Sequence, residues 1–356
     1  MRGGRRRASG VVTKPKINTM EQLSEAIGVS RPTLSRYFQD PQSVRGTTAA
    51  KIRQGLDRVD YVPNFFATRL NRKSSGLIGV ILPHLNDLFY TNLLEAIERA
   101  ACEADFTVIT QSSHGNAELE AVAIEKLMSM NAEGVIVAPL GETGAVGALA
   151  RLGTSLPLVF VDSRLPNAMP ETDFVGTDNR QSIGVMVEYL CRTGAPPVYL
   201  GMPRVNSNSQ ERERAYRDRM ADLGAMAEVI DNAAGREGWA FEAFAHDVMD
   251  RHFGRGLYCD ATILCANDRL GIGALRAAMR HGLFRPGETR PPIRIAGHDD
   301  HPLSRFMTPS LTTVSQNKAA IGRAAVQLLI QRMRRDGPST PVQQTFEAVL
   351  EIRESA

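Results

Sequence analysis

The stretch Gly28-Val29-Ser30-Arg31-Pro32-Thr33-Leu34-Ser35-Arg36-Tyr37 has the form of the turn and second helix of a helix-turn-helix. Gly28 can take the left-handed backbone conformation that such a turn needs. Ser30 can cap the following helix by accepting a backbone N–H from its first turn. Pro32 falls within that first turn, where a missing N–H costs little. The pattern therefore predicts that one helix ends at Gly28 and a second begins a few residues later.

The predicted second helix has one apolar side and one polar side. Leu34 and Phe38, four residues apart, are expected to face a small core. The opposite side is polar, as a helix laid in the major groove of DNA requires. Its members are Arg31, Thr33, Ser35 and Arg36.

Two more short helices are predicted around this stretch. Thr19-Met20-Glu21-Gln22 has the form of a capping box for the first, and Thr47 or Thr48 is expected to cap the third. The apolar face of the first helix is Leu23, Ala26 and Ile27; that of the third is Ile52, Leu56 and Val59. Three short helices bury little surface, so this unit should be only marginally stable alone.

The charge of the chain is unevenly distributed. Residues 1–73 hold 15 Lys and Arg residues against 5 Asp and Glu, whereas the remainder holds 27 against 34. A basic N-terminal segment joined to an acidic remainder indicates a polyanionic partner for the N-terminal segment, most simply nucleic acid. Residues 1–17 are basic and lack periodicity, which predicts a disordered tail.

Composition sets the broad class of the protein. A chain of 356 residues with 43% hydrophobic residues can form two or three globular domains. No apolar run approaches the ~20 residues of a membrane span, and no apolar segment follows the Arg-rich start as in a secretory signal. The scattered residues Cys102, Cys191, Cys259 and Cys265 are interpreted as buried free thiols. These features predict a cytoplasmic protein without a metal or cofactor.

From residue 77 onward, short apolar strands alternate with amphipathic helices. This alternation predicts βαβ units and parallel sheets, arranged as two similar lobes with a cleft between them. Ligands of such folds bind at the carboxyl ends of the strands. Strands are expected near residues 77–82, 106–111, 134–138, 158–162, 198–201, 227–231, 262–266, 293–297 and 344–352. Helices are expected near 182–191, 209–223, 239–252, 268–281 and 318–335.

Several motifs occur together in a fixed order: Gly28-Val29-Ser30, Tyr61-Val62-Pro63-Asn64, Ala266-Asn267-Asp268, Gly297-His298-Asp299-Asp300 and Leu311-Thr312-Thr313. In this combination the chain, from about Thr19 to its end, resembles the lac repressor family of bacterial transcription regulators. The resemblance implies an all-α helix-turn-helix headpiece, a hinge helix and a two-lobed α/β core similar to periplasmic sugar-binding proteins. It also implies dimers or tetramers on pseudo-palindromic operators, and the lack of a leucine heptad tail favours a dimer.

The expected boundaries follow from these patterns. The tail covers residues 1–17, the headpiece 18–63, and the hinge helix with its linker 64–75. The core covers 76–356. Its first lobe is expected at about 76–175 and 315–336, and its second lobe at about 176–314 and 337–356.

The resemblance also assigns candidate DNA contacts. Arg31, Pro32 and Arg36 occupy the base-reading face, where Arg36 is the best candidate for bidentate contact with guanine and Pro32 can offer only an apolar contact. Phosphate contacts are expected from Thr19, Ser30, Thr33, Ser35 and Thr48, although each hydroxyl could instead serve only as a cap or surface group. In the hinge helix, Leu70 would wedge into the minor groove, supported by Asn64 and Ala67.

Candidate effector contacts come mainly from the expected strand ends. Arg212 matches a family arginine that reaches sugar hydroxyls or a carboxylate, and Trp239 could stack on a sugar ring or simply be lobe core. The predicted set is Phe89, Tyr90, Asp162, Arg212, Trp239, Asn267 and Asp299. Carboxylates, an amide, an arginine and aromatic rings together suit a sugar, sugar acid or polyol.

Function follows as a prediction from the resemblance and these residues. The chain is expected to be a bacterial, nucleoid-associated repressor whose operator binding responds to a carbohydrate-like effector. A corepressor-dependent regulator that responds to another metabolite is the alternative. An enzyme using Asp162 and Asp299 as a glycosidase pair is disfavoured, because no nucleophile, phosphate-binding or zinc motif accompanies them.

Overall fold

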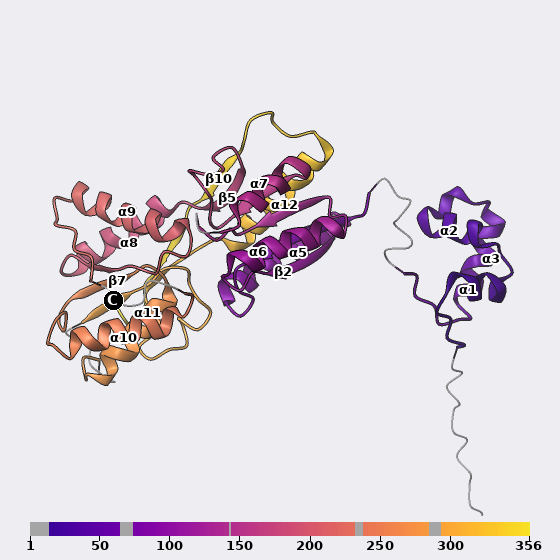
Figure 1. Cartoon of the computed structure of the whole chain (residues 1–356). Helices are drawn as coiled ribbons and strands as arrows, with labels where there is room; N and C mark the ends of the chain where they lie inside the picture. Colours follow the sequence, from indigo (N-terminus) through magenta and orange to yellow (C-terminus); the bar gives the residue numbers. More distant parts are fainter. Residues whose placement is uncertain (1–13, 65–73, 142–143, 232–237, 285–292) are drawn as a thin grey trace, which may run out of the picture. The chain divides into compact units, whose positions relative to one another are not determined.

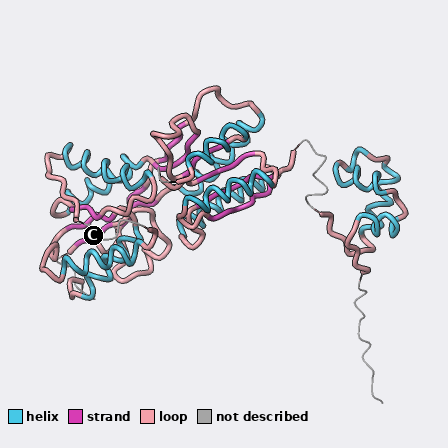
Figure 2. Tube along the Cα trace, in the orientation of Figure 1, coloured by secondary structure: helices cyan, strands magenta, loops and turns pink. Residues whose placement is uncertain are grey.

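The computed structural model describes residues 14–64, 74–141, 144–231, 238–284 and 293–356. The chain divides into two compact units, Met1–Ser75 and Gly76–Ala356, and each is described by itself (Figures 1 and 2). The predictions for residues 1–13, and for Ala67 and Leu70 in the hinge, lie outside the described residues. They remain predictions from the sequence.

The headpiece consists of three short helices around one apolar cluster. α1 (Met20–Ile27), α2 (Arg31–Gln39) and α3 (Gly46–Leu56) are joined by the left-handed turn at Gly28 and the 3-10 helix η1 (Pro41–Ser43). The buried cluster contains Leu23, Ile27, Leu34, Tyr37, Ala49, Ile52 and Val59. The predicted helix-turn-helix is therefore present.

Several details of the headpiece differ from expectation. Ser30 precedes α2 but makes no side-chain cap bond, because its hydroxyl pairs with that of Thr33 at 2.8 Å. α3 begins after Arg45, so neither Thr47 nor Thr48 caps it. Ala26 is exposed. Tyr37 is buried in the core, whereas Phe38 is only half-buried.

The first lobe of the core is a six-stranded sheet covered on both faces. Its order is β10-β5-β4-β3-β1-β2, and every pair is parallel. α5 (Leu88–Glu103) and α12 (Lys318–Arg334) cover one face, and α6 (Ala117–Ser129) and α7 (Val146–Ser155) the other (Figure 1). The strands are β1 (Leu77–Leu82), β2 (Thr107–Ser112), β3 (Gly134–Val137), β4 (Leu158–Val161), β5 (Asp173–Thr177) and β10 (Gln343–Phe346).

The second lobe has a smaller parallel sheet in the order β6-β7-β8. These strands are β6 (Val198–Leu200), β7 (Thr262–Cys265) and β8 (Arg294–Ala296). Beside them, β9 (Thr313–Ser315) pairs antiparallel with β11 (Val349–Glu351). The helices are α8 (Asn179–Thr193), α9 (Ser207–Asp222), α10 (Phe241–Phe253) and α11 (Asp268–Arg280), in two pairs that lie on opposite sides of the sheet (Figure 1).

The core corrects three predictions about strands. The expected strand 227–231 is reduced to one bridge between Tyr199 and Val229, and neither β5 nor β9 was predicted. The expected final strand is two strands in different sheets, because the Gln181 side chain binds both backbone groups of Ala348 and interrupts the run. β10 therefore belongs to the first lobe, although the sequence placed residues 337–356 in the second.

The cysteines also differ from expectation. All four are free, but Cys102 is exposed, Cys191 and Cys259 are half-buried, and Cys265 is the fully buried one. Among the described residues, no helix combines the length and apolarity that crossing a bilayer requires.

Candidate functional site

Strands of both lobes end at a small cavity of about 40 Å³, enough for a few water molecules at most. Its wall contains every residue that the sequence singled out for an effector: Phe89, Tyr90, Asp162, Arg212, Trp239, Asn267 and Asp299. They come from the ends of β4, β7 and β8, from α9, and from the segments at the start of α5 and α10. The sequence pattern therefore identified residues that meet in space, although their binding of an effector stays a prediction.

Asp162 is a buried carboxylate with neutral partners. Tyr90 donates its hydroxyl to Oδ2 at 2.9 Å, and the Asn208 amide donates to Oδ1 at 3.1 Å. Burial raises the pKa of Asp162 to about 7, against the opposing effect of Arg212. The backbone φ of Asp162 is 63° and that of Asp299 is 117°. Such left-handed positions are sparsely populated by non-glycine residues and concentrate at functional sites.

Arg212 connects the groups on the second-lobe side of the cavity. Its side chain is 4% exposed and lies 3.0 Å from Asp299. Nε donates to Oδ1 of Asn179 at 3.1 Å, and Nη1 donates to the carbonyl of Ala266 at 2.8 Å. Burial alone would raise the pKa of Asp299, but Arg212 and His298 lower it to about 2. Asp299 and Arg212 therefore form a buried ion pair at neutral pH.

His298 lies behind Asp299 and outside the cavity wall. Its Nδ1 is 2.7 Å from Asp299 Oδ1, and its Nε2 is 2.8 Å from Ser182 Oγ. This is the order of groups in a hydrolase triad, but Ser182 and His298 are both fully buried. Burial and Arg212 lower the pKa of His298 to about 4, so the imidazole is neutral and serves to fix the Asp299 carboxylate.

Direct contacts hold the two lobes together around the cavity. Arg269 of the second lobe lies 3.0 Å from Asp87 of the first and also binds Glu242 at 2.7 Å. The Trp239 ring packs against Tyr90 with centroids 6.1 Å apart, and Gly115 leaves the space that its indole occupies. Trp239 is therefore both part of the packing between the lobes and part of the cavity wall.

Sequence reasoning missed part of this wall. Asn206, Asn208, Asp87 and Arg269 line the cavity but were not selected. Asn206 and Asn208 belong to the run Asn206-Ser207-Asn208-Ser209, which follows a strand and begins a helix. Such a polar run at a strand end could have pointed to them. Asn267, which was selected, also caps α11 by accepting from Leu270 N–H at 2.8 Å.

The pH dependence of stability should report the buried state of Asp162. Because burial raises the folded pKa of Asp162 from its ordinary value near 3.8 to about 7, its contribution to stability is full below about pH 4 and is lost as pH rises through 7. Asn at this position stays neutral. Relative to Asp162→Asn, the wild type should lose free energy of unfolding between pH 4 and 7, with a constant difference above about pH 8. Urea unfolding followed through Trp239 measures this, and a difference that does not change with pH would contradict it.

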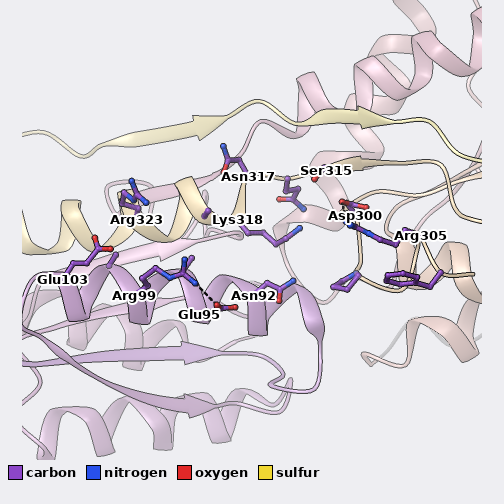
Figure 3. Close-up of a pocket in the computed structure, with 16 residues that line it drawn as sticks. Asn92, Glu95, Arg99, Glu103, Asp300, Arg305, Ser315, Asn317, Lys318 and Arg323 are labelled. Carbon is purple, nitrogen blue, oxygen red and sulfur yellow. Dashed lines mark hydrogen bonds and ion pairs between the residues drawn. The ribbon is translucent and has the colours of Figure 1, made fainter.

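A larger hollow of about 570 Å³ lies on the outside of the core. Figure 3 shows Asn92, Glu95, Arg99 and Glu103 of α5 facing Lys318 and Arg323 of α12 across it, with Asp300 and Arg305 at one end. The hollow is open and contains none of the predicted effector residues. The smaller cavity, where buried polar groups of both lobes converge, is therefore the candidate site for a ligand.

The predicted DNA-contact residues form a mostly exposed surface of the headpiece. Arg31, Pro32 and Arg36 are exposed, as are Thr19, Ser30 and Asn64, whereas Thr33, Ser35 and Thr48 are half-buried. Arg31 lies 3.6 Å from Glu21. Lys51, which was not predicted, donates to the carbonyl of Gly28 at 2.8 Å and ties α3 to the turn.

Comparison with known proteins identifies both units. A helix-turn-helix model matches residues 14–61, and a periplasmic binding protein-like domain matches 187–356. The HTH-type transcriptional regulator MalR of Streptomyces coelicolor is 27% identical over 329 residues, covering 88% of this chain and 90% of that protein. The lac repressor bound to ONPG has a TM-score of 0.80 at 23% identity, with 95% of this chain and 99% of that chain covered. A putative transcriptional regulator of the LacI family from Sanguibacter keddieii is 28% identical and has a TM-score of 0.66. This match covers 79% of this chain and 98% of that chain.

A helix-turn-helix unit combined with a two-lobed core of this kind defines a DNA-binding transcriptional regulator. The chain belongs to the lac repressor family.

Proposed function

We propose that this regulator is a repressor that binds a pseudo-palindromic operator as a homodimer and responds to a carbohydrate-like effector held between its lobes. Arg31 and Arg36 would read bases in the major groove, and Leu70 would wedge into the minor groove. Effector binding would change how the lobes are held together, and so shift the population of DNA-binding chains. The protein would act in the bacterial cytoplasm at the nucleoid.

The observation that carries this proposal is the cavity between the lobes. Asn208 and Arg269 of the second lobe bind Asp162 and Asp87 of the first directly across it. A ligand that enters must replace or rearrange these contacts, because the free volume is only about 40 Å³. Binding at this point is therefore coupled to the arrangement of the lobes, which is what an allosteric effector requires.

Operator recognition is tested at Arg36. A duplex is first selected by the full chain from a randomised pool, and its affinity is then measured by fluorescence anisotropy. Arg36→Ala should weaken binding to the selected duplex by about 1–3 kcal/mol, or tenfold to a hundredfold, if the guanidinium reads a base. Binding to an unrelated duplex should change much less. An equal loss of affinity for both duplexes would contradict base reading and indicate that Arg36 contacts only phosphate.

A further inference from the structure

The chain before Glu21 carries charged side chains of one sign only. It contains six cationic side chains and no acidic one: Arg2, Arg5, Arg6, Arg7, Lys14 and Lys16. The DNA contacts proposed above for the helix-turn-helix and the hinge use none of these six groups. Like charges close together in sequence repel one another and favour a polyanionic partner, so these groups are available for a second contact.

The last residues of this segment have a fixed place in the headpiece. The sequence predicted a tail covering residues 1–17, but residues 14–17 lie beside Asp60, and Lys16 forms a parallel bridge with it. The Ile17 N–H donates to the Asp60 carbonyl at 2.9 Å, and the Asp60 N–H donates to the Pro15 carbonyl at 3.0 Å. Ile17 also packs against the apolar cluster of the headpiece. Residues 14–17 are therefore a fixed root for the basic segment.

Two predicted DNA contacts lie close to this root. Thr19, the cap of α1 and a predicted phosphate contact, follows Ile17 by two residues. Asn64, a predicted hinge contact, follows Asp60 by four residues. An extended residue spans at most about 3.6 Å, so Thr19 is within about 7 Å of Ile17 and Asn64 within about 14 Å of Asp60. Because Ile17 and Asp60 are bonded to each other, DNA bound at both contacts would pass close to the root.

The two lysines of the root are free to bind an anion. Lys14 and Lys16 are exposed. Arg31 and Glu21 form the one ion pair among the described residues of the headpiece, so no paired carboxylate neutralises either ammonium group. Asp60, at the bridge, offsets at most one positive charge of the segment. The segment and its root therefore keep a net positive charge beside the predicted DNA contacts.

We propose that residues 2–16 act as a basic arm that binds the phosphate backbone of the operator DNA beside the hinge. The proposal rests on the proposed function, because the arm adds contacts to the DNA that the headpiece binds. The thirteen residues before Lys14 span at most about 45 Å when extended, which exceeds one helical turn of DNA, about 34 Å. Phosphate contacts carry no sequence information, so the arm raises the affinity for every duplex while the recognition helix selects one.

The salt dependence of DNA binding by the full chain tests the arm. Each phosphate contact contributes about 0.9 to the slope of log K against log salt concentration. Replacing Arg5, Arg6 and Arg7 together by Gln should therefore lower the magnitude of the slope by about 3 per chain. Lys14→Gln with Lys16→Gln should lower it by about 2 per chain. Fluorescence anisotropy with the selected duplex, from about 50 to 200 mM salt, measures both changes.

The sequence dependence of the loss identifies the kind of contact. Both arm variants should lose affinity equally for the selected duplex and for an unrelated one, because phosphates are the same in both. Arg36→Ala, by contrast, should affect mainly the selected duplex. Replacing Arg5, Arg6 and Arg7 by Lys keeps the charge and should keep the slope. A loss in this lysine variant that is confined to the selected duplex would show base contact and overturn the phosphate assignment.

A core variant controls for net charge. Arg151, Arg192 and Arg217 are exposed on the core, and replacing all three by Gln removes the same charge as the arginine variant of the arm. The slope of this control should equal that of the wild type. Hydrogen exchange of α1 to α3 should be unchanged in every variant, because the bridge at Asp60 uses backbone groups.

The outcomes separate the arm from operator recognition. A wild-type slope in both arm variants would overturn the arm and leave operator recognition standing. The same slope with a loss of binding to RNA or to anionic lipid vesicles would assign the arm to that polyanion and also overturn its role on the operator. An equal fall in the core control would reduce the effect to net charge. If the full chain selects no duplex from the randomised pool, operator recognition fails, and the arm fails with it.

Discussion

Replacing Arg212 by alanine is expected to destabilise the core by about 3–5 kcal/mol, because it leaves a buried carboxylate without its cation. Asp299 would lose the guanidinium that keeps its pKa low, and the carbonyl of Ala266 would lose its donor. A core of this size should then melt on the order of 10 °C lower. The same variant should abolish the effector response, since Arg212 lies in the cavity wall.

Arg217→Ala provides the matched control. Arg217 lies on the same helix, but it is half-exposed and pairs with Glu213 one turn away. Such surface pairs contribute roughly 0–1 kcal/mol, so this variant should melt close to the wild type. Thermal unfolding followed through Trp239 compares the two. Similar melting temperatures for both variants would show that the buried network is not structurally important.

Leu34→Ala is expected to abolish operator binding by unfolding the headpiece. Leu34 is fully buried at the centre of its apolar cluster, and truncating such a leucine costs about 2–5 kcal/mol. A unit of three short helices has little stability to lose. Hydrogen exchange of α1 to α3 should become fast, while the melting of the core should not change, since the two units have separate apolar clusters.

The control for this variant is Val62→Ala, because Val62 is 82% exposed and its truncation should be nearly neutral. Retention of operator binding by Leu34→Ala, with protected amides in α2, would contradict the account of how the headpiece is held together.

The sequence predicted the helix-turn-helix well, because its cues are local. A glycine in a left-handed turn, a proline in a first turn and an apolar spacing of three to four residues act over a few positions. Details that depend on competition between neighbours were predicted less well. Ser30 was expected to cap α2, but its hydroxyl is taken by Thr33. The residue types alone do not decide whether the Ser30 hydroxyl binds the backbone of α2 or the hydroxyl of Thr33.

In the core, too, features with local cues were predicted better than features that depend on distant residues. Alternating apolar runs predicted most strands. β5 was not predicted, and β10 is an exposed polar strand at the edge of its sheet. Its pairing with β5 brings together residues about 170 positions apart, which local pattern does not report. Cavity residues at strand ends, such as Asp162 and Asp299, were found because parallel strands share one carboxyl edge. Arg269 was missed because its place in the wall depends on how the second lobe meets the first, whereas Asn206 belongs to a polar run after a strand that was not used as a signal.

The central claim is that a ligand in the cavity between the lobes controls the affinity of the headpiece for DNA. The direct measurement is the affinity of the full chain for its selected duplex, by fluorescence anisotropy, with and without a ligand that stabilises the core. The account predicts a change of at least about tenfold in the wild type, corresponding to a coupling free energy of roughly 1.4 kcal/mol or more. The change should be lost in Asn206→Ala at the same ligand concentration. An operator affinity that stays constant while the ligand saturates Trp239 would contradict it.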